Sequence, residues 1–158
     1  MKSLRGFTLI ELMITLAVAA ILLTVAVPSF QTLIKRNALT ARTNNFIADL
    51  HFARGEAAKR GSDVSVCPSS NGTTCDTSAA NWKNGWSIIP TGQTAVRRSE
   101  ALTGTLTLST TKAKIIFKSS GITGEQESLT FCETSIKESR VVQISSAGHV
   151  STTKGTCP

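Results

Sequence analysis

The sequence has few of the residues, and none of the short motifs, that usually mark a catalytic centre. It contains two histidines, His51 within a helical pattern and His149 after a turn glycine. It has no glycine-rich phosphate loop, no H-E-x-x-H zinc motif, no C-x-x-C redox pair and no nucleophile motif around any serine. We therefore interpret both histidines as ordinary surface or packing residues, and we expect neither an enzyme nor a bound cofactor.

Charge is almost absent from residues 7–27, FTLIELMITLAVAAILLTVAV, in which Glu11 is the single ionisable side chain. As a helix this run would be about 32 Å long, which matches a hydrocarbon core of about 30 Å. A cleaved secretory signal peptide is the alternative, but its apolar region runs to about 7–15 residues and ends in an A-x-A-like site. This run is longer and ends in Val27-Pro28. Lys2 and Arg5 precede it, and basic residues stay cytoplasmic, so we expect one membrane span with the C-terminal part outside.

Residues 5–11, RGFTLIE, resemble the processing site of type IV pilins and type II secretion pseudopilins. The resemblance includes the basic leader, Gly6, Phe7, Glu11 and Pro28. It implies that a prepilin peptidase in the inner membrane cleaves after Gly6 and that the new N-terminal residue, Phe7, is methylated. The head would then be periplasmic before the chain enters a pilus or pseudopilus.

The resemblance also implies a reason for Glu11, because a carboxylate in hydrocarbon is costly. Glu11 would pair with the N-terminal amine of a neighbouring subunit as helices stack in a filament. At low dielectric such a pair attracts strongly, and one charge without the other is strongly penalised. The alternative is a tolerated polar residue near a helix end.

Residues 29–60 are predicted to continue the helix. Pro28 removes one backbone hydrogen bond and should kink or locally open the helix at the membrane boundary. Lys59, Arg60 and Gly61 suit the helix C-terminus. The apolar side chains recur at three- and four-residue steps and form one stripe that should pack on a globular head: Phe30, Leu33, Ile34, Phe46, Ile47, Leu50, Ala53 and Ala57.

The excess of basic residues lies next to the apolar run. The formal net charge is +7, and residues 29–60 hold six bases and two acids, whereas residues 61–158 hold nine bases and seven acids. The basic segment can meet anionic inner-membrane lipid before assembly or acidic neighbours in a filament. A plain solvated helix face is the alternative.

Beyond Gly61 the period changes from that of a helix to the alternation of strands. We expect an exposed loop at residues 68–83. Because the predicted strands follow one another without intervening helices, the fold should be α+β, with a head of antiparallel sheets against the long helix. The predicted strands are 63–67, 86–89, 105–109, 113–118, 128–133, 140–145 and 149–153.

Short motifs in this region, F117-x-x-x-G121, LTFC at 129–132, RVVQIS at 140–145 and G148-x-V150, resemble the head of the GspH/FimT group of minor pilins and pseudopilins. In that group two antiparallel sheets pack against the helix. The expected organisation is a cleaved leader (1–6), a membrane and filament-core helix (7–28), an amphipathic helix (29–60) and a β-rich head (61–158).

Four cysteines, Cys67, Cys75, Cys132 and Cys157, are compatible with disulfides in an external location, and three pairings are possible. We expect Cys67–Cys75, which would clip the polar loop to the preceding strand, and Cys132–Cys157, which would tie down the tail. Metal ligation is the alternative. It lacks support, because neither histidine is close to two cysteines in sequence, and we expect no metal.

Three functions fit the resemblance. The first is a minor type IV pilin that primes or caps a pilus with other major and minor pilins; the cysteines and the polar loop favour it. The second is a GspH-like pseudopilin of type II secretion. The third is a DNA-binding minor pilin of natural transformation, but members of that kind share a G-R-x-R motif where this chain has GHVS at 148–151. Lys137, Arg140 and Lys154 can still form a weak patch for DNA or an acidic partner.

Overall fold

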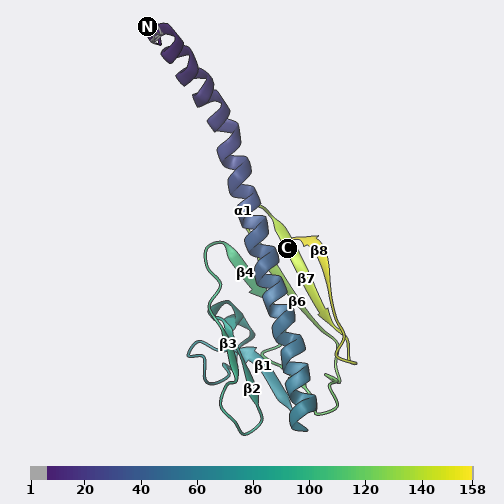
Figure 1. The fold of residues 1–158 in the computed structure, drawn as a ribbon. Helices are drawn as coiled ribbons and strands as arrows, with labels where there is room; N and C mark the ends of the chain where they lie inside the picture. The colour runs from purple at the N-terminus through teal and green to yellow at the C-terminus, as the bar shows by residue number, and fades with distance from the viewer. Residues whose placement is uncertain (1–6, 158) are drawn as a thin grey trace, which may run out of the picture. The chain divides into compact units, whose positions relative to one another are not determined.

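The computed structural model describes residues 7–157, and the predicted leader, with Gly6, lies outside the described residues. The chain divides into two compact units, residues 1–35 and 36–158. One helix, α1 (Leu9–Arg60), contributes to both units and is drawn in purple to blue in Figure 1.

In the first unit, α1 is apolar on every side. Its large apolar side chains between Phe7 and Ile34 are about half exposed or more, and an 18-residue window within α1 reaches a mean hydropathy of 2.5. The helix is unbroken through Pro28, and the Thr32 hydroxyl donates to the Pro28 carbonyl at 3.0 Å. Pro28 therefore does not interrupt the helix, although it cannot donate a backbone hydrogen bond.

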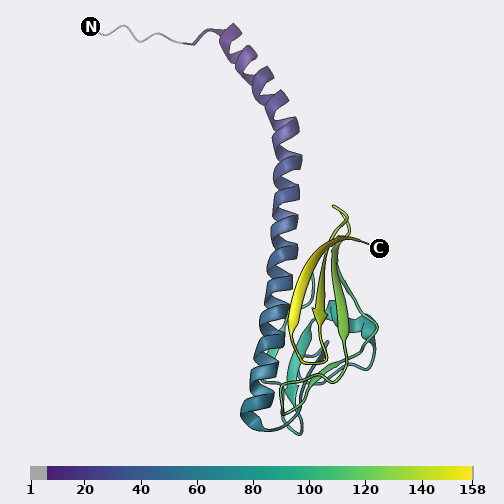
Figure 2. The ribbon, with the colours of Figure 1, turned by 90° about the vertical axis from the view of Figure 1, so that its right-hand side faces the viewer.

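In the second unit, residues 36–60 of α1 pack against two four-stranded antiparallel sheets (Figures 1 and 2). The first sheet has the order β3-β2-β1-β5, from β3 (Arg97–Ser99), β2 (Trp86–Pro90), β1 (Val64–Pro68) and β5 (Ile115–Phe117). The second has the order β4-β6-β7-β8, from β4 (Leu106–Ser109), β6 (Glu127–Glu133), β7 (Glu138–Ile144) and β8 (Val150–Thr156). The predicted α+β class is confirmed.

Phe46 is the centre of the core. Its ring makes edge contacts with Trp86 of the first sheet at 5.0 Å, Phe131 of the second sheet at 5.5 Å and Trp82 at 5.8 Å. One helical side chain thus joins both sheets. Such aromatic pairs add about 0.5–1.5 kcal/mol each beyond the area they bury.

The buried stripe of the helix differs from the predicted one at its start. Phe30, Leu33 and Ile34 are 51–63% exposed and belong to the first unit. The buried face that packs on the head begins at Leu39 instead. Steps of three and four residues continue from there through Thr43, where a hydroxyl that donates to the Leu39 carbonyl at 2.8 Å replaces an apolar group. The apolar run therefore continues past Pro28, and the amphipathic pattern starts later.

Residues 68–83 are not simply an exposed loop, so that prediction was wrong. They contain most of a 3₁₀ helix, η1 (Ala79–Asn84), capped by Ser78, whose hydroxyl accepts from the Ala80 N–H. Trp82 is fully buried, and its indole N–H donates to the Lys112 carbonyl at 2.9 Å. A single tryptophan among polar residues has no periodicity, so the pattern could not show that this segment contributes to the core.

A buried carboxylate, Asp49, attaches the first sheet to α1. It accepts from the Trp86 indole at 2.7 Å, and Arg97 Nε lies 2.8 Å from its other oxygen. Arg97 also lies over the Phe52 ring, 5.2 Å from its centroid. These contacts hold β3, a strand that the sequence pattern did not predict because it is short and basic.

Candidate functional site

The described part of the processing site begins at Phe7, which is 87% exposed and lies just before the first turn of α1. Lys2, Arg5 and Gly6 of the expected leader lie outside the described residues. Phe7 and Thr8 precede the helix, so the backbone of Phe7 is held in neither a helix nor a sheet.

Glu11 closes a capping box with Thr8. The Thr8 N–H and hydroxyl both donate to Glu11 Oε2 at 2.9 Å, while the Glu11 N–H donates to the Thr8 hydroxyl at 3.3 Å. This reciprocal pattern satisfies backbone donors at a helix N-terminus. Sequence reasoning missed it, although the T-x-x-E spacing is its usual signal. Within residues 7–157, Glu11 Oε1 accepts no hydrogen bond, so one carboxylate oxygen remains for another partner.

Two disulfides stabilise the head, joining Cys67 to Cys75 and Cys132 to Cys157. The first links β1 to the segment that leads to η1. The second links β6 to the residue that follows β8, across the intervening strand β7. The N–H of Cys157 also donates to the Lys137 carbonyl at 3.2 Å, so the C-terminal tail is fixed by both a covalent and a hydrogen bond.

We expect Cys157→Ser to lower the free energy of unfolding of the oxidised head by about 2–4 kcal/mol, because the bond closes a long loop and restricts the unfolded chain. Thermal unfolding of wild type and variant, with and without reductant, measures this. Non-reducing peptide mapping of the wild-type chain is the control. A free Cys157 or a Cys75–Cys157 link in that chain would contradict the pairing.

The turn between β7 and β8 is held by Arg54 of α1. Its guanidinium donates to the Gly148 carbonyl at 3.0 Å and to the Ala147 carbonyl at 3.2 Å. Gly148 has a φ of 77°, and a Cβ there would collide with the Gly121 carbonyl, so both its conformation and its surroundings require glycine. Sequence analysis did not single out Arg54, since a lone arginine on a helix carries no signal of its own. His149, next to Gly148, is exposed, as is His51.

The predicted basic patch is only partly brought together. Arg140 on β7 and Lys154 on β8 are direct partners in the sheet, and with Arg36 and Glu138 they line a groove of about 380 Å³. Lys137 lies in the turn between β6 and β7, with a φ of 55°, and is not among the residues that line this groove. Arg36 also lines this groove, although the sequence pattern did not place it in the patch.

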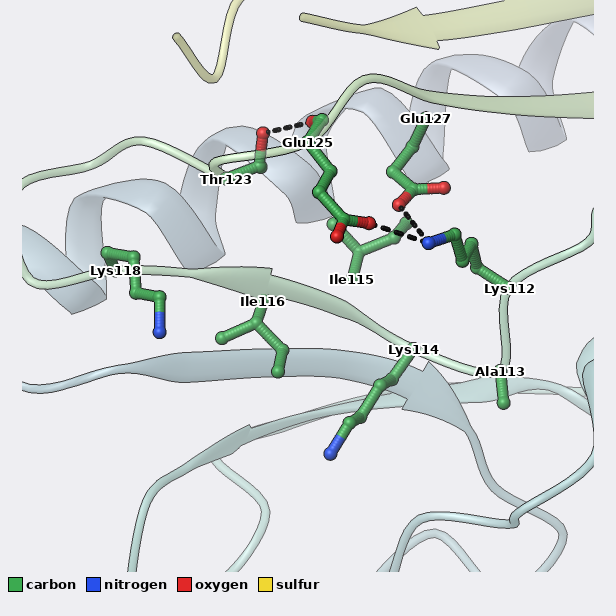
Figure 3. Close-up of a pocket in the computed structure, with 9 residues that line it drawn as sticks. All are labelled: Lys112, Ala113, Lys114, Ile115, Ile116, Lys118, Thr123, Glu125 and Glu127. Atoms are coloured by element: carbon green, nitrogen blue, oxygen red, sulfur yellow. Dashed lines mark hydrogen bonds and ion pairs between the residues drawn. The ribbon is translucent and has the colours of Figure 1, made fainter. Parts of the chain in front are cut away.

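A second hollow, of about 370 Å³, lies beside β5 and is shown in Figure 3. Lys112 Nζ is 2.6 Å from a Glu125 oxygen and 3.6 Å from a Glu127 oxygen. The hydrogen bond that Lys112 donates to Glu125 raises the pKa of Lys112 and lowers the pKa of Glu125, whereas burial raises the pKa of Glu127. The ammonium of Lys112 is thus paired with both carboxylates of this hollow.

Metal ligands do not gather in the described head or helix. Among residues 7–157 no group of three or more His, Cys, Asp or Glu side chains is placed to hold a metal ion. Within the same residues, all four cysteines are joined in disulfides, which leaves no thiolate for a metal or for redox chemistry.

Comparisons with known proteins agree with this geometry. The family described as type II transport protein GspH matches residues 42–148, and the prokaryotic N-terminal methylation motif matches residues 1–27. A crystal structure of the type IV minor pilin FimU of Pseudomonas aeruginosa strain PAO1, in space group P21, has a TM-score of 0.61 at 21% identity and covers 78% of this chain and 97% of that chain.

The P65 crystal form of FimU gives a TM-score of 0.58 at 20% identity and covers 76% of this chain and 100% of that chain. No curated protein matches this chain. Since the GspH match spans well over half of its length, and the methylation motif precedes it, this protein belongs to the GspH family and is a minor pilin or pseudopilin.

Proposed function

We propose that this chain is a minor type IV pilin that is cleaved after Gly6, methylated on Phe7 and then incorporated into a pilus, whose assembly it helps to prime. One observation carries the proposal: α1 is apolar and exposed on every side from Leu9 to Ile34, with a single acid near its start. Such a surface is stable only in lipid or among other apolar helices.

The same apolar surface can be covered first in the membrane and then in the filament. In the inner membrane, lipid covers it, and in the filament the helices of major and minor pilins replace the lipid. Glu11 would fix the position of each subunit, because its free Oε1 can accept from the methylated amine of a neighbour. The carboxylate is already held by Thr8, so little side-chain freedom is lost when the pair forms.

Contact with anionic lipid or acidic neighbours would rest on fewer basic residues than the sequence suggests. Arg36 pairs with Glu138, Arg54 holds the Gly148 turn and Arg60 pairs with Glu56. Of the six bases in residues 29–60, Lys35 and Arg42 make neither an ion pair nor a side-chain hydrogen bond with any residue of 7–157. These two basic side chains still favour contact with anionic lipid head groups.

A pseudopilin of type II secretion is the second candidate, because the matching family is described as type II transport protein GspH. The two functions differ in the filament that contains the chain. Mass spectrometry of sheared pili, together with an exoprotein secretion assay in a deletion strain, distinguishes them. Peptides of this chain in pili with normal secretion support the pilin; a secretion defect with no peptides in pili supports the pseudopilin.

We expect weak binding to duplex DNA. The β7–β8 turn carries His149 where DNA-binding members have arginine, and the nearby Arg54 guanidinium is used on backbone carbonyls. Without several fixed charges at phosphates, affinity is low, because each neutralised phosphate adds to binding by releasing counterions. A fluorescence titration at about 0.15 M salt measures this. Low-micromolar or tighter binding that is lost on changing Arg140 or Lys154 would promote the DNA-uptake function.

A further inference from the structure

The inner face of the second sheet is apolar at one end and positively charged at the other. Because side chains alternate along a strand, Ile144, Val142, Arg140 and Glu138 of β7 lie on one face. Their sheet partners on β8 are Val150, Thr152, Lys154 and Thr156. At the Ile144 end this face is apolar and packs on the core, with Ile144, Val142 and Val150 buried. The pair Arg140–Lys154 continues the same face with two positive charges.

This charged end of the face borders α1. Thr40, Thr43 and Asn44 of the helix and Thr152, Thr153 and Lys154 of β8 line a groove of about 200 Å³, with Arg140 also lining it. Figure 2 shows β8, in yellow, running beside this part of the helix. The adjoining groove of about 380 Å³ shares Arg140 and Lys154 and extends to Arg36. The two hollows therefore share the same two cations, and we call them together the α1–β8 groove.

The two central cations of the groove have no acid of their own. Arg140 donates to the Ser139 carbonyl at 3.0 Å, and neither Arg140 nor Lys154 forms an ion pair with any residue of 7–157. The acid of the groove, Glu138, is engaged by Arg36, whose Nη2 lies 2.6 Å from its Oε1. Two like charges on adjacent strands repel, which is costly unless an anion lies between them.

We propose that the α1–β8 groove binds acidic side chains from a neighbouring filament subunit. The guanidinium of Arg140 and the ammonium of Lys154 would donate to a carboxylate, and the hydroxyls of Thr40 and Thr152 would supply further donors. The inference rests on the proposed function for the identity of the partner. Residues 36–44 directly follow the apolar run, so this end of the head is the end nearest in sequence to the surface that other subunits cover.

The charges of the groove favour a protein segment over nucleic acid. Its two hollows measure about 200 and 380 Å³, which leaves room for one or more acidic side chains. A duplex needs several cations spread along its backbone. Here two unpaired cations lie together and Glu138 stands beside them. An acidic segment of a protein therefore fits the groove better than nucleic acid.

The test uses the full-length chain in non-ionic detergent and a fluorescent oligoglutamate peptide, with oligoglutamine as the uncharged probe. The site variant is Arg140→Gln with Lys154→Gln. The matched control is Lys83→Gln with Lys114→Gln, which removes the same charge from two exposed lysines that form no ion pair within residues 7–157. Lys154→Gln alone, at an exposed side chain, guards against a folding defect, and thermal unfolding checks every variant.

We expect the site variant to weaken oligoglutamate binding by about tenfold or more, the control by less than about threefold, and Lys154→Gln by an intermediate factor. Equal weakening by site variant and control, or no binding by wild type, overturns the proposal. Tighter binding of duplex DNA than of oligoglutamate at the same residues also overturns it, in favour of nucleic acid.

Recovery from sheared pili separates this inference from the proposed function. We expect the site variant to be recovered less than the control variant. Wild-type chain that is absent from pili contradicts the proposed function, and peptide binding then decides whether the groove binds acids. Wild-type chain that is present in pili, with the site variant recovered and binding as wild type does, contradicts the groove alone.

Discussion

The Gly6→Arg protein is expected to keep its leader in a host with an active prepilin peptidase, whereas Gly6→Ala is expected to be cleaved normally or more slowly. A protease that accepts a glycine at the membrane surface has little space beside the scissile bond, so a large, charged side chain clashes with it. Intact-mass measurement of the membrane-extracted chain distinguishes the two forms, since cleavage removes residues 1–6 and methylation adds to Phe7.

The alanine variant is the matched control, because it changes the same residue with little added volume. Leader loss by Gly6→Arg at the wild-type rate would contradict the pilin-type processing proposed here. Cleavage of both variants elsewhere in residues 1–27 would instead indicate an ordinary signal peptide. The expected effect is large, because an uncleaved chain has no amine at Phe7 to pair with a neighbouring Glu11.

Glu11→Val is expected to insert into the membrane as well as wild type or better, and to be nearly absent from filaments. Insertion improves because an ionised side chain in the bilayer centre costs about 2.5–3.5 kcal/mol on insertion scales. Incorporation fails because the amine of the neighbouring subunit is left in a low-dielectric filament core without its counter-charge. Membrane fractionation and quantitative mass spectrometry of sheared filaments measure the two effects separately.

The capping box makes Glu11→Gln the informative comparison. Glutamine can still accept from the Thr8 N–H, as glutamate does at 2.9 Å, but it carries no charge. If Glu11 serves only as a helix cap, Glu11→Gln behaves like wild type; if it neutralises a neighbouring amine, Glu11→Gln fails in filaments as Glu11→Val does. We expect the second outcome. Normal filament recovery of both variants would falsify the pairing role.

The predictability of this protein differs between its two ends. From Phe7 to Val27 the sequence is sufficient to predict an apolar helix, because few structures can accommodate a continuous apolar run with one acid. The motif around Gly6 and Phe7 is also specific. The helix from Leu9 to Arg60 was predicted to within two residues at its start. The T-x-x-E spacing of Thr8 and Glu11 is typical of a capping box, but the resemblance to a processing site assigns Glu11 to pairing with a neighbouring amine instead.

In the head, alternation located most strands, since period-two burial is a local property of the chain. It missed β3, whose three residues are held by a long-range pair between Arg97 and Asp49. It also missed η1, whose Trp82 is buried against Phe46 of the helix. Neither feature has a periodic signal, because each depends on a helix residue that is distant in sequence, Phe46 for Trp82 and Asp49 for Arg97.

The sequence by itself determined the long helix, its apolar and exposed N-terminal part, the α+β class of the head and the motif at which the chain is expected to be processed. These follow from composition and short-range period, which act between near neighbours along the chain. Only the tertiary structure decided that Phe46 joins both sheets, that Arg54 holds the Gly148 turn and that Arg140 and Lys154 line a groove beside α1 with no ion pair to any residue of 7–157. Those contacts depend on strand pairing and on which helical face is buried, and both are set when distant segments pack together.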